Sequence, residues 1–515
     1  MKIIDFYKFN KILGIIAGLI SFTVFALTVE PTASYWDCAE YISTSAKLQI
    51  GHPPGAPLFQ MLGAIFSIFA MELDQIAYAI NMMSVVSSAL TIMFLFWSIS
   101  LIGKELFSLN NKINLNQAIK IFGASFLGSI SFTFTDSFWF NAVEAEVYAM
   151  ATLILSLLFW MGLKWADDFE KERSDKWLIL ISLVVGLSFG VHFMGLLAIP
   201  SIGLIYYFKR KKKFDLKSFI IANIISVSIL LFIFKLLLPS TLSLFGNLEV
   251  FFVNDLGLPF NSGTIFTAIF LVGLIYYGLS VSAQKKLYWL NTSLLCLTFI
   301  FIGFSSWLMI PIRSNANTVI NENSPSDARS LLAYYNLEQY PDTYLFYGPM
   351  FSDIYAGQDS QNPYKDERPK YERDYEINKY IVVNDWKNGK INSNKNHEGF
   401  FPRMWSSDNA LNYMKYFGAL DFEVKNEYKS EEQITDLVSS FKSRIDQNEV
   451  EEDDYNEFFS NFGSYLDIEK PSLLSNINYF VNFQLSKMYF RYFMWNFSGR
   501  QNDKQWKYDV ENGNW

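Results

Sequence analysis

The chain is poor in the residues that build disulfide frameworks and zinc sites. Among its 515 residues there are only two cysteines and three histidines. Cys38 lies in a polar stretch and Cys296 inside an apolar one, so we expect no disulfide between them and no cysteine-rich metal site. The histidines are scattered, and no HExxH or CxxC pattern occurs. These absences argue against the common zinc enzymes and against a disulfide-stapled fold.

Nucleotide-binding loops and an excess of positive charge are missing as well. The sequence has no G-x-x-x-x-G-K-[ST] loop and no glycine-rich turn after a strand, so chemistry on ATP or a nucleotide sugar is not expected. The formal net charge is -8, which argues against a nucleic-acid partner. The polybasic run at 209–213 lies between two apolar stretches, a position typical of a membrane topology signal.

Apolar and aromatic residues, by contrast, are abundant. Hydrophobic residues make up 51% of the chain and aromatic residues 18%, and the mean hydropathy is +0.15. This mean is too low for a chain lying wholly in a membrane and too high for an ordinary soluble protein. We therefore predict an α-helical polytopic membrane domain over residues 1–310, joined to a polar, mixed α/β external domain over residues 311–515.

The apolar runs predict about nine membrane crossings. They lie at 12–29, 76–102, 118–135, 147–165, 177–208 (two short helices turning near His192), 219–239, 263–283 and 287–310. Lysines before the first run place the N-terminus in the cytoplasm by the positive-inside rule. The first external loop is then 30–75, and its apolar piece 56–71 is expected to dip into the outer leaflet, a full crossing being the alternative. Residues 311–515 are expected in the periplasm, outside a bacterial inner membrane.

Inside the polar domain, local patterns predict both helices and strands. Helical periodicity occurs at 326–335, 431–444 and 473–492, and short strand-like runs occur at 344–347 and 380–383. No repeat or low-complexity segment is present. The pattern is typical of a folded domain rather than a disordered tail.

Two carboxylates and a histidine gather in the first external loop. Asp37 and Glu40 are three residues apart, so they share one face if the segment is helical, and His52 follows in GHPPGAPL at 51–58. In one interpretation Ser34 and Asp37 cap a helix and Glu40 is merely solvated. In the other, the carboxylates act on a substrate at the membrane surface.

The order of these residues resembles a known family. The run DCAE at 37–40, followed by GHPPGAPL at 51–58, is similar to the D-x-x-E…HPPG-x-PL signature of protein O-mannosyltransferase-like proteins. That family includes the animal enzymes that mannosylate plexin-type receptor domains and many bacterial membrane proteins of uncharacterised role. It belongs to the GT-C glycosyltransferase superfamily, whose members use polyprenyl-phosphate sugars and carry an acidic catalytic residue in the first external loop.

The resemblance implies a GT-C-like membrane glycosyltransferase. The expected reaction moves a hexose, mannose by resemblance, from a polyprenyl-phosphate carrier to a Ser or Thr hydroxyl of an exported protein. Asp37 would be the general base, and Glu40 would position the acceptor or Asp37 itself. Because bacterial relatives often continue into further membrane helices and a helical-repeat region, we expect this chain to be a short member or a piece truncated at its C-terminus.

Four further positions are predicted to bind substrate beside His52. Glu144 and Glu146 lie in the second external loop, whose AEVYA core (145–149) also resembles the family; the alternative is that both cap the following helix. The resemblance places a histidine at the position of His192, for which a phosphate contact and a hydrogen-bonded core role stay equally open. Arg313 could hold a phosphate through two hydrogen bonds or extend to the interface as a snorkelling side chain.

Several alternatives remain open at the level of sequence. No cofactor is required by the pattern, although a divalent cation held by Asp37, Glu40 and Glu146 is compatible with it. Within the same fold, the acceptor could be a lipid or a cell-wall glycan. A transporter would need paired inverted repeats and broken helices in matching halves, whereas only one broken region is evident in the sequence. A non-catalytic envelope scaffold would use the external domain as its interaction surface.

Overall fold

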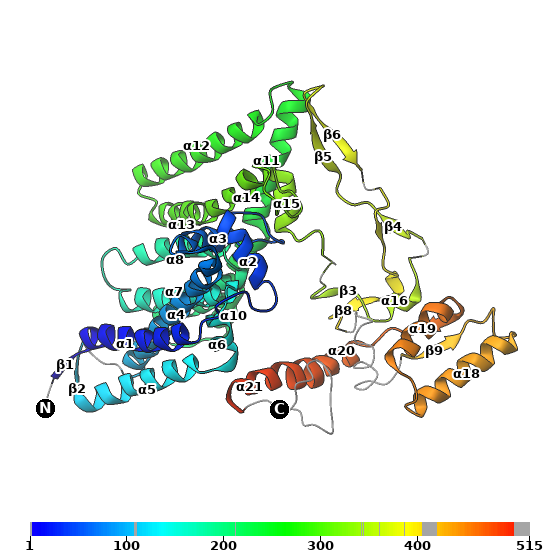
Figure 1. The fold of residues 1–515 in the computed structure, drawn as a ribbon, viewed down its shortest axis with the longest axis horizontal. Coiled ribbons are helices and arrows are strands. Elements are labelled where there is room, and N and C mark those ends of the chain that lie inside the picture. Colours follow the sequence, from blue (N-terminus) through cyan, green and yellow to red (C-terminus); the bar gives the residue numbers. More distant parts are fainter. Residues whose placement is uncertain are drawn as a thin grey trace. The chain divides into compact units, whose positions relative to one another are not determined.

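A computed structural model of the chain describes residues 3–107, 111–211, 213–340, 342, 344–359, 361–385, 387–403 and 420–498 (Figure 1). The chain divides into two compact units, Met1–Tyr340 and Pro341–Trp515. The division falls later than the predicted boundary at residue 310, because the segment 311–340 pairs with the first loop through a bridge between Ile50 and Asn321.

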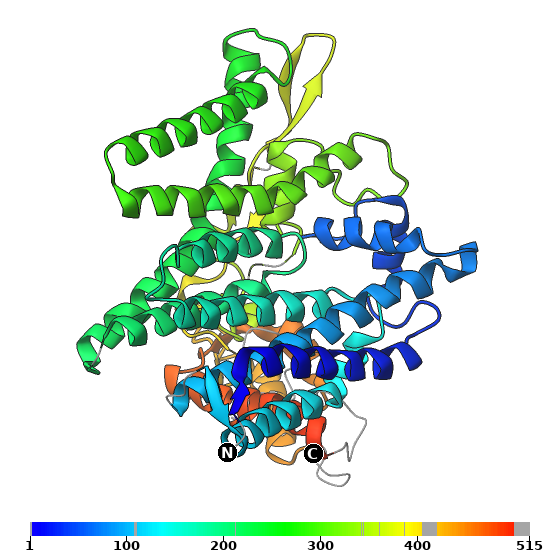
Figure 2. The ribbon, with the colours of Figure 1, turned by 90° about the vertical axis from the view of Figure 1, so that its left-hand side faces the viewer.

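The first unit is a bundle of apolar helices, which Figure 2 shows lying side by side. Among the described residues, six helical segments are long and apolar enough to cross a membrane: Phe6–Leu27, Leu73–Leu106, Val147–Asp167, Leu216–Asp255, Ser262–Gln284 and Tyr288–Ser314. They contain α1 (Phe6–Leu27), α4 (Ile76–Leu106), α7 (Val147–Asp167), α10 (Leu216–Leu231), α11 (Leu238–Val250), α12 (Ser262–Gln284), α13 (Tyr288–Phe304) and α14 (Met309–Ser314). A seventh span is counted if α5 (Leu115–Thr133) and α6 (Asp136–Ala142), bent by 68°, form one broken helix. The chain is thus a polytopic helical membrane protein.

The structure has up to seven candidate spans, whereas the sequence predicts about nine crossings. The two numbers differ because two of the predicted crossings are short helices. Helices α8 (Lys176–Ser188) and α9 (Ala198–Arg210) have 13 residues each, about 20 Å at 1.5 Å per residue, whereas a bilayer's hydrocarbon core is about 30 Å thick. They are joined through the turn at His192 and the 3-10 helix η2 (Phe193–Leu197), as the sequence predicted. Helix α3 (Pro57–Ser67), with 11 residues, is shorter still, which favours the dipping segment over a full crossing.

The longest helical segment continues where the sequence predicted a loop. Leu216–Asp255 is helical over 40 residues, with π-helical turns at η3 (Phe232–Leu237) and η4 (Phe251–Asp255). The helix end predicted at Pro239 is therefore wrong, and of the loop implied between the apolar runs, 240–262, only 256–261 lies outside the helices. Pro239 directly follows the π-helical turn η3, and local π-helical adjustments of this kind allow a membrane helix to continue through a proline.

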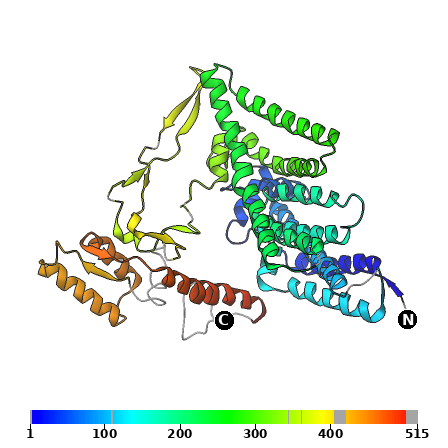
Figure 3. The ribbon, with the colours of Figure 1, turned by 180° about the vertical axis from the view of Figure 1, so that it is seen from behind.

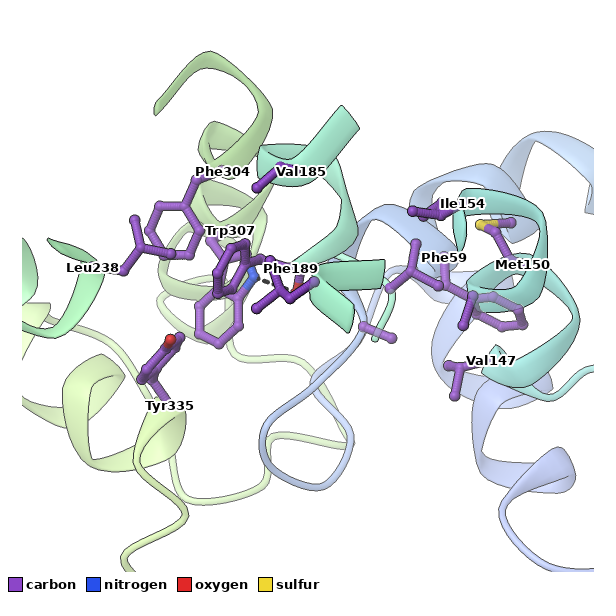
Figure 4. Close-up of a cluster of buried hydrophobic side chains, with 14 of the residues drawn as sticks. Phe59, Val147, Met150, Ile154, Val185, Phe189, Leu238, Phe304, Trp307 and Tyr335 are labelled. Atoms are coloured by element: carbon purple, nitrogen blue, oxygen red, sulfur yellow. Dashed lines mark hydrogen bonds between the residues drawn. The ribbon is translucent and has the colours of Figure 1, made fainter. Parts of the chain in front are cut away.

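The core of this unit ties the first loop to the membrane helices. Figure 4 shows Phe59 of α3 packed near Val147 and Met150 of α7, and Trp307 near Phe189. The Trp307 indole donates a hydrogen bond to the Phe189 carbonyl over 2.8 Å. The same apolar cluster therefore contains residues of α3, α7 and the segment that follows α13.

The second unit is built from small antiparallel sheets and helices, as predicted for a mixed α/β domain (Figure 3). Its strand pairs are β3 (Tyr347–Pro349) with β8 (Glu398–Phe400), β4 (Tyr364–Lys365) with β7 (Lys390–Ile391), β5 (Lys370–Asp374) with β6 (Lys379–Asn384), and β9 (Phe422–Val424) with β10 (Leu466–Ile468). Its helices include α16 (Asp353–Ala356), α18 (Glu432–Asp446), α19 (Glu452–Phe462), α20 (Leu473–Tyr479), the π-helical segment η9 (Phe480–Phe490) and α21 (Arg491–Ser498). The predicted helices at 431–444 and 473–492 are present, and the strand predicted at 344–347 begins only at its last residue.

Candidate active site

The first-loop carboxylates are carried by the start of α2 (Cys38–Lys47). Asp37 occupies the N-cap position, yet its side chain makes no capping hydrogen bond and is 57% exposed. The capping interpretation therefore fails for Asp37, and its carboxylate is open to a substrate. Glu40 follows one turn later, only 26% exposed, on the face predicted to be shared with Asp37.

His52 lies between the two carboxylates. Its Nδ1 is 3.1 Å from both carboxylate oxygens of Glu40, and its backbone N–H donates to Glu40 Oε1 over 2.6 Å. On the other side of the ring, Nε2 is 3.8 Å from Asp37 Oδ2. The hydrogen bond to Glu40 raises the pKa of His52. Burial alone would raise the pKa of Glu40, but the hydrogen bonds from the His52 ring and backbone lower it.

Two glycines and a tyrosine shape the loop that carries His52. A side chain at Gly51 would overlap the Glu40 carboxylate, so only glycine permits this approach. Gly55 has φ +72° and faces the ring of Tyr334. The Tyr334 hydroxyl, on α15 (Ala328–Tyr335), donates to the Gly51 carbonyl over 2.6 Å. The GHPPG segment is thus a rigid turn built to hold His52 against Glu40.

Arg313 supports the far end of α2. Its Nε donates to the Leu48 carbonyl over 2.6 Å and its Nη2 to the Lys47 carbonyl over 3.1 Å. A cation on the last carbonyls of a helix also interacts favourably with the helix dipole. The structure therefore gives Arg313 a positioning contact that sequence reasoning did not foresee.

The strand-like segment after Arg313 brings a further carboxylate into the neighbourhood. Ile50 donates to the Ile320 carbonyl over 3.0 Å, and the Glu322 N–H donates to the Ile50 carbonyl over 3.1 Å. Burial and then the negative charge of Glu40 raise the pKa of Glu322. Neither Glu322 nor Tyr334 was among the predicted site residues, because no local pattern signals contacts with a loop so distant in the sequence.

Glu144 and Glu146 are buried in the second loop, with exposed fractions of 2% and 4%. The loops are joined by a hydrogen bond of 3.0 Å from the Glu30 N–H to the Val143 carbonyl. Asn81 of α4 donates to the Glu30 carbonyl over 2.7 Å. Glu146 is the N-cap of α7 but makes no side-chain capping bond, so the capping alternative fails for it too.

The electrostatics place Glu146 beside Asp37. Burial, and then the negative charges of Asp37 and Glu144, raise the pKa of Glu146 to about 7, against a weaker opposing hydrogen bond from the Asp37 backbone. Burial also raises the pKa of Glu144. One carboxylate oxygen of each residue has no hydrogen-bond partner among the described residues. Near neutral pH, Glu146 is therefore partly protonated.

His192 joins the site indirectly. Its Nδ1 accepts a hydrogen bond from the Met194 N–H over 3.1 Å, and its ring centroid lies 5.4 Å from that of Tyr148, two residues after Glu146. Burial lowers the pKa of His192, which favours a neutral ring. The turn is held to the first loop because the Leu58 N–H donates to the Gly190 carbonyl over 2.7 Å.

One group of side chains in the described part of the chain could hold a metal ion. Asp37, Glu40 and His52 each offer a ligand atom, and these atoms lie within 4.8 Å of one another. The set differs from the predicted one because His52 takes the place of Glu146. Two carboxylates and an imidazole suit a divalent cation. The same arrangement is also explained without a metal ion, because His52 and Glu40 contact each other directly as a hydrogen-bonded ion pair.

Comparisons with known proteins cover mainly the first unit. Residues 37–215 match the family model described as protein O-mannosyl-transferase TMEM260 N-terminal domain. The protein O-mannosyl-transferase tmem260 of Dictyostelium discoideum is 27% identical over 206 residues, which cover 38% of this chain and 23% of that protein. The protein O-mannosyl-transferase TMEM260 of Mus musculus is 24% identical over 165 residues, covering 32% of this chain and 21% of that protein. The matched region thus spans less than a quarter of either relative.

The second unit has its own match. Residues 341–481 match a model described as a family of unknown function (DUF8416), which begins where the second compact unit begins. No solved structure matches the chain. The similarity to the protein O-mannosyl-transferase family model, which the motifs at 37–58 indicate, therefore extends over α4 and α7 to residue 215 but does not include α1.

Proposed function

We propose, from the similarity of residues 37–215 to protein O-mannosyl-transferases, that the chain is a membrane glycosyltransferase of the GT-C type. It would move a hexose, mannose by analogy with these relatives, from a polyprenyl-phosphate carrier to a Ser or Thr hydroxyl of an exported protein. The observation that supports this best is Asp37, an exposed and uncapped carboxylate beside His52 and the buried Glu146.

Asp37 is suited to accept the proton of the attacking hydroxyl. In the proposed step the acceptor oxygen forms a bond to the anomeric carbon of the sugar, and the bond from that carbon to the phosphate oxygen breaks. The polyprenyl phosphate leaves with the bonding electron pair, and the hydroxyl proton passes to Asp37. An ionised carboxylate at a helix N-terminus, open to water, can perform this general-base role.

Glu40 and His52 would support Asp37 and the departing phosphate. Because Glu40 raises the pKa of His52, the ring keeps a positive charge over a wider pH range. That charge lies 3.8 Å from Asp37 and would orient its carboxylate. A protonated Glu146 would lower the negative charge of the site, which favours binding of an anionic donor.

Arg313 and His192 are the proposed contacts to the phosphate or the carrier. A guanidinium has five N–H donors, so the two bonds from Arg313 to backbone carbonyls are compatible with a phosphate contact. The neutral His192 ring, next to Tyr148, would contact the carrier or the sugar. A divalent cation at Asp37, Glu40 and His52 is the alternative source of positive charge, and metal analysis of the purified protein distinguishes the two.

The proposed orientation has the N-terminus in the cytoplasm and the Asp37 loop at the periplasmic surface of a bacterial inner membrane. The basic residues around Lys209 would then lie on the cytoplasmic side, in agreement with the positive-inside rule. The polar second unit would lie in the periplasm, where an exported acceptor can reach it. Transfer to a lipid or a cell-wall glycan, and a non-catalytic envelope transporter or scaffold, are the competing functions.

Substitution of Asp37 by Asn tests the proposal. Loss of the base should reduce mannose transfer from a polyprenyl-phosphate donor by about 100-fold or more, with no change in thermal unfolding. The matched control is Asp74→Asn, an exposed acidic residue in the same loop. Mass spectrometry of exported glycopeptides from strains carrying each variant reports the acceptor. Unchanged glycosylation with Asp37→Asn would reject the base assignment, and a strain lacking the protein that loses no protein glycan would reject a protein acceptor.

A further inference from the structure

A cavity lies at the opposite end of the membrane unit from Asp37. It has a volume of about 1110 Å³ and lies between residues of α7, α8, α9, α10 and α13. Trp165, near the C-terminal end of α7, lines it, whereas Glu146 precedes the N-terminus of that helix. The 21 residues of α7 separate the two regions by about 30 Å at 1.5 Å per residue. The cavity is therefore distinct from the candidate active site.

The walls of the cavity are apolar over most of their length. Those contributed by α8, α9 and α10 include Leu178, Ile199, Ile202, Ile221, Ile225 and Ile229. Only Ser226 of α10 is buried, and it meets α9 where a side chain at Gly203 would overlap its hydroxyl. Away from this close contact the α10 side chains Ile221 and Ile225 are 46% and 53% exposed. An apolar space this large between membrane helices suits acyl chains better than water.

The mouth of the cavity carries charges of both signs. Arg210 and Lys211 line it, and so do Glu170 and Asp175. The Arg210 guanidinium is held above the Phe169 ring at 5.7 Å, and its Nε donates to the Tyr206 hydroxyl over 3.3 Å. The mouth therefore offers two cations and two carboxylates above an apolar chamber.

We propose that this cavity binds one aminophospholipid, whose headgroup carries both a phosphate and an ammonium group. Its phosphate would lie at Arg210 and Lys211, its ammonium group at Glu170 and Asp175, and its acyl chains along α9 and α10. A purely anionic headgroup would meet the two carboxylates, and a bulky quaternary ammonium could not donate hydrogen bonds to them. Basic pockets between membrane helices are known sites for lipid headgroups. The sugar donor is not the occupant, because its phosphate has to reach Asp37. The inference rests on the membrane fold, and only the exclusion of the sugar donor rests on the proposed function.

The test is lipid retention by the full-length chain. The protein is reconstituted into nanodiscs with equal amounts of phosphatidylethanolamine, phosphatidylglycerol and phosphatidylcholine, extracted in mild detergent, and its bound lipids are quantified by mass spectrometry. Phosphatidylethanolamine should be enriched on the unmodified chain. Arg210→Gln with Lys211→Gln should lower retention of all phospholipids, about fivefold for each cation. Glu170→Gln with Asp175→Asn should keep retention but remove the preference for phosphatidylethanolamine.

Lys285→Gln with Lys286→Gln is the matched control, because it removes two exposed cations at the α12–α13 turn, outside the residues that line the cavity. It should retain lipid like the unmodified chain. Ala222→Trp, which places a bulky ring inside the chamber, should lower retention, and thermal unfolding shows whether this variant folds. Lipids retained in their nanodisc ratio, enrichment of phosphatidylglycerol, or equal loss in the lysine control would overturn the proposal.

Discussion

Two neighbouring acids, Asp37 and Glu146, differ in their exposure to water: the Asp37 carboxylate is exposed, whereas the Glu146 carboxylate is buried. Asp37 is 57% exposed, whereas Glu146 is 4% exposed, and one of its carboxylate oxygens has no hydrogen-bond partner in the part of the chain that the structure describes. Burying a carboxylate disfavours its charged form. The proposed site thus combines an accessible base with a second carboxylate that is readily protonated, and each can be tested separately.

Glu146→Gln should stabilise the protein at alkaline pH. The pKa of Glu146 is raised from 4.5 to about 7 in the folded protein. Between these values the unfolded state releases the proton more readily, so ionisation of Glu146 progressively destabilises the fold as the pH rises, by an amount on the order of 3 kcal/mol above pH 7. The variant should therefore melt higher than the unmodified protein at pH 8 and equally at pH 4.5.

Thermal unfolding in detergent at both pH values is the measurement. Glu72→Gln, at an exposed position of the first loop, is the control and should show no pH-dependent gain. A melting difference of the same size at pH 4.5 and pH 8 would contradict the ionisation argument.

Glu40→Gln should shift the pH dependence of transfer. Its hydrogen bond raises the pKa of His52, so the neutral amide should lower that pKa. The imidazolium would then be lost at a lower pH, and the alkaline limb of the rate profile should move down by about one unit. The rate of mannose transfer is measured from pH 5 to 9, with Glu72→Gln for comparison. An alkaline limb that stays in place would show that His52 protonation does not limit the reaction.

At the level of elements, the close packing of α8 against α13 depends on small residues. Side chains added at Gly186 or Gly303 would overlap the backbone of the opposite helix. In a membrane, where burial from lipid provides little driving force, such close approach supplies much of the association energy. The two short helices α8 and α9 are held in place by this contact and by the turn at His192.

Gly186→Val should destabilise the bundle by about 1–3 kcal/mol through overpacking. The control is Gly273→Val on α12, where an added side chain meets no atom within 4 Å. The midpoint of thermal unfolding is measured for both variants in the same detergent. Gly273→Val should leave this midpoint nearly unchanged. Equal midpoints for the two variants would mean that α8 and α13 are not held by close backbone contact.

At the scale of the whole molecule, residues 311–340 belong to the membrane unit. They supply Arg313 on the end of α2, the Asn321 bridge to Ile50 and the Tyr334 bond to Gly51. The polar composition of this segment does not indicate that it packs against the first loop. Its contacts with that loop are made through backbone groups and single side chains, which form no recognisable sequence pattern. The loop that carries the candidate site is therefore completed only by residues at the end of the last membrane span and after it.

A fragment ending at residue 340 should keep the loop intact, whereas one ending at residue 310 should not. Hydrogen exchange followed by mass spectrometry should show protected amides at 48–55 in the longer fragment and faster exchange there in the shorter one, since its hydrogen-bond partners are removed. Far-ultraviolet circular dichroism verifies that both fragments retain their membrane helices. Equal protection at 48–55 would show that the segment 311–340 does not hold the loop.

The sequence alone determined the class of the protein and much of its candidate site. Apolar runs predict helices reliably because a bilayer requires each span to satisfy its own backbone hydrogen bonds over a set length. The acids of the two loops were likewise recognisable from local residues. Only the tertiary structure decided that the helix continues through Pro239, that Arg313 bonds the end of α2, that Tyr334 holds the His52 turn, and that Glu146 is buried beside Asp37. The last three of these depend on residues far apart in the chain, and their proximity is set by packing, which no local pattern encodes.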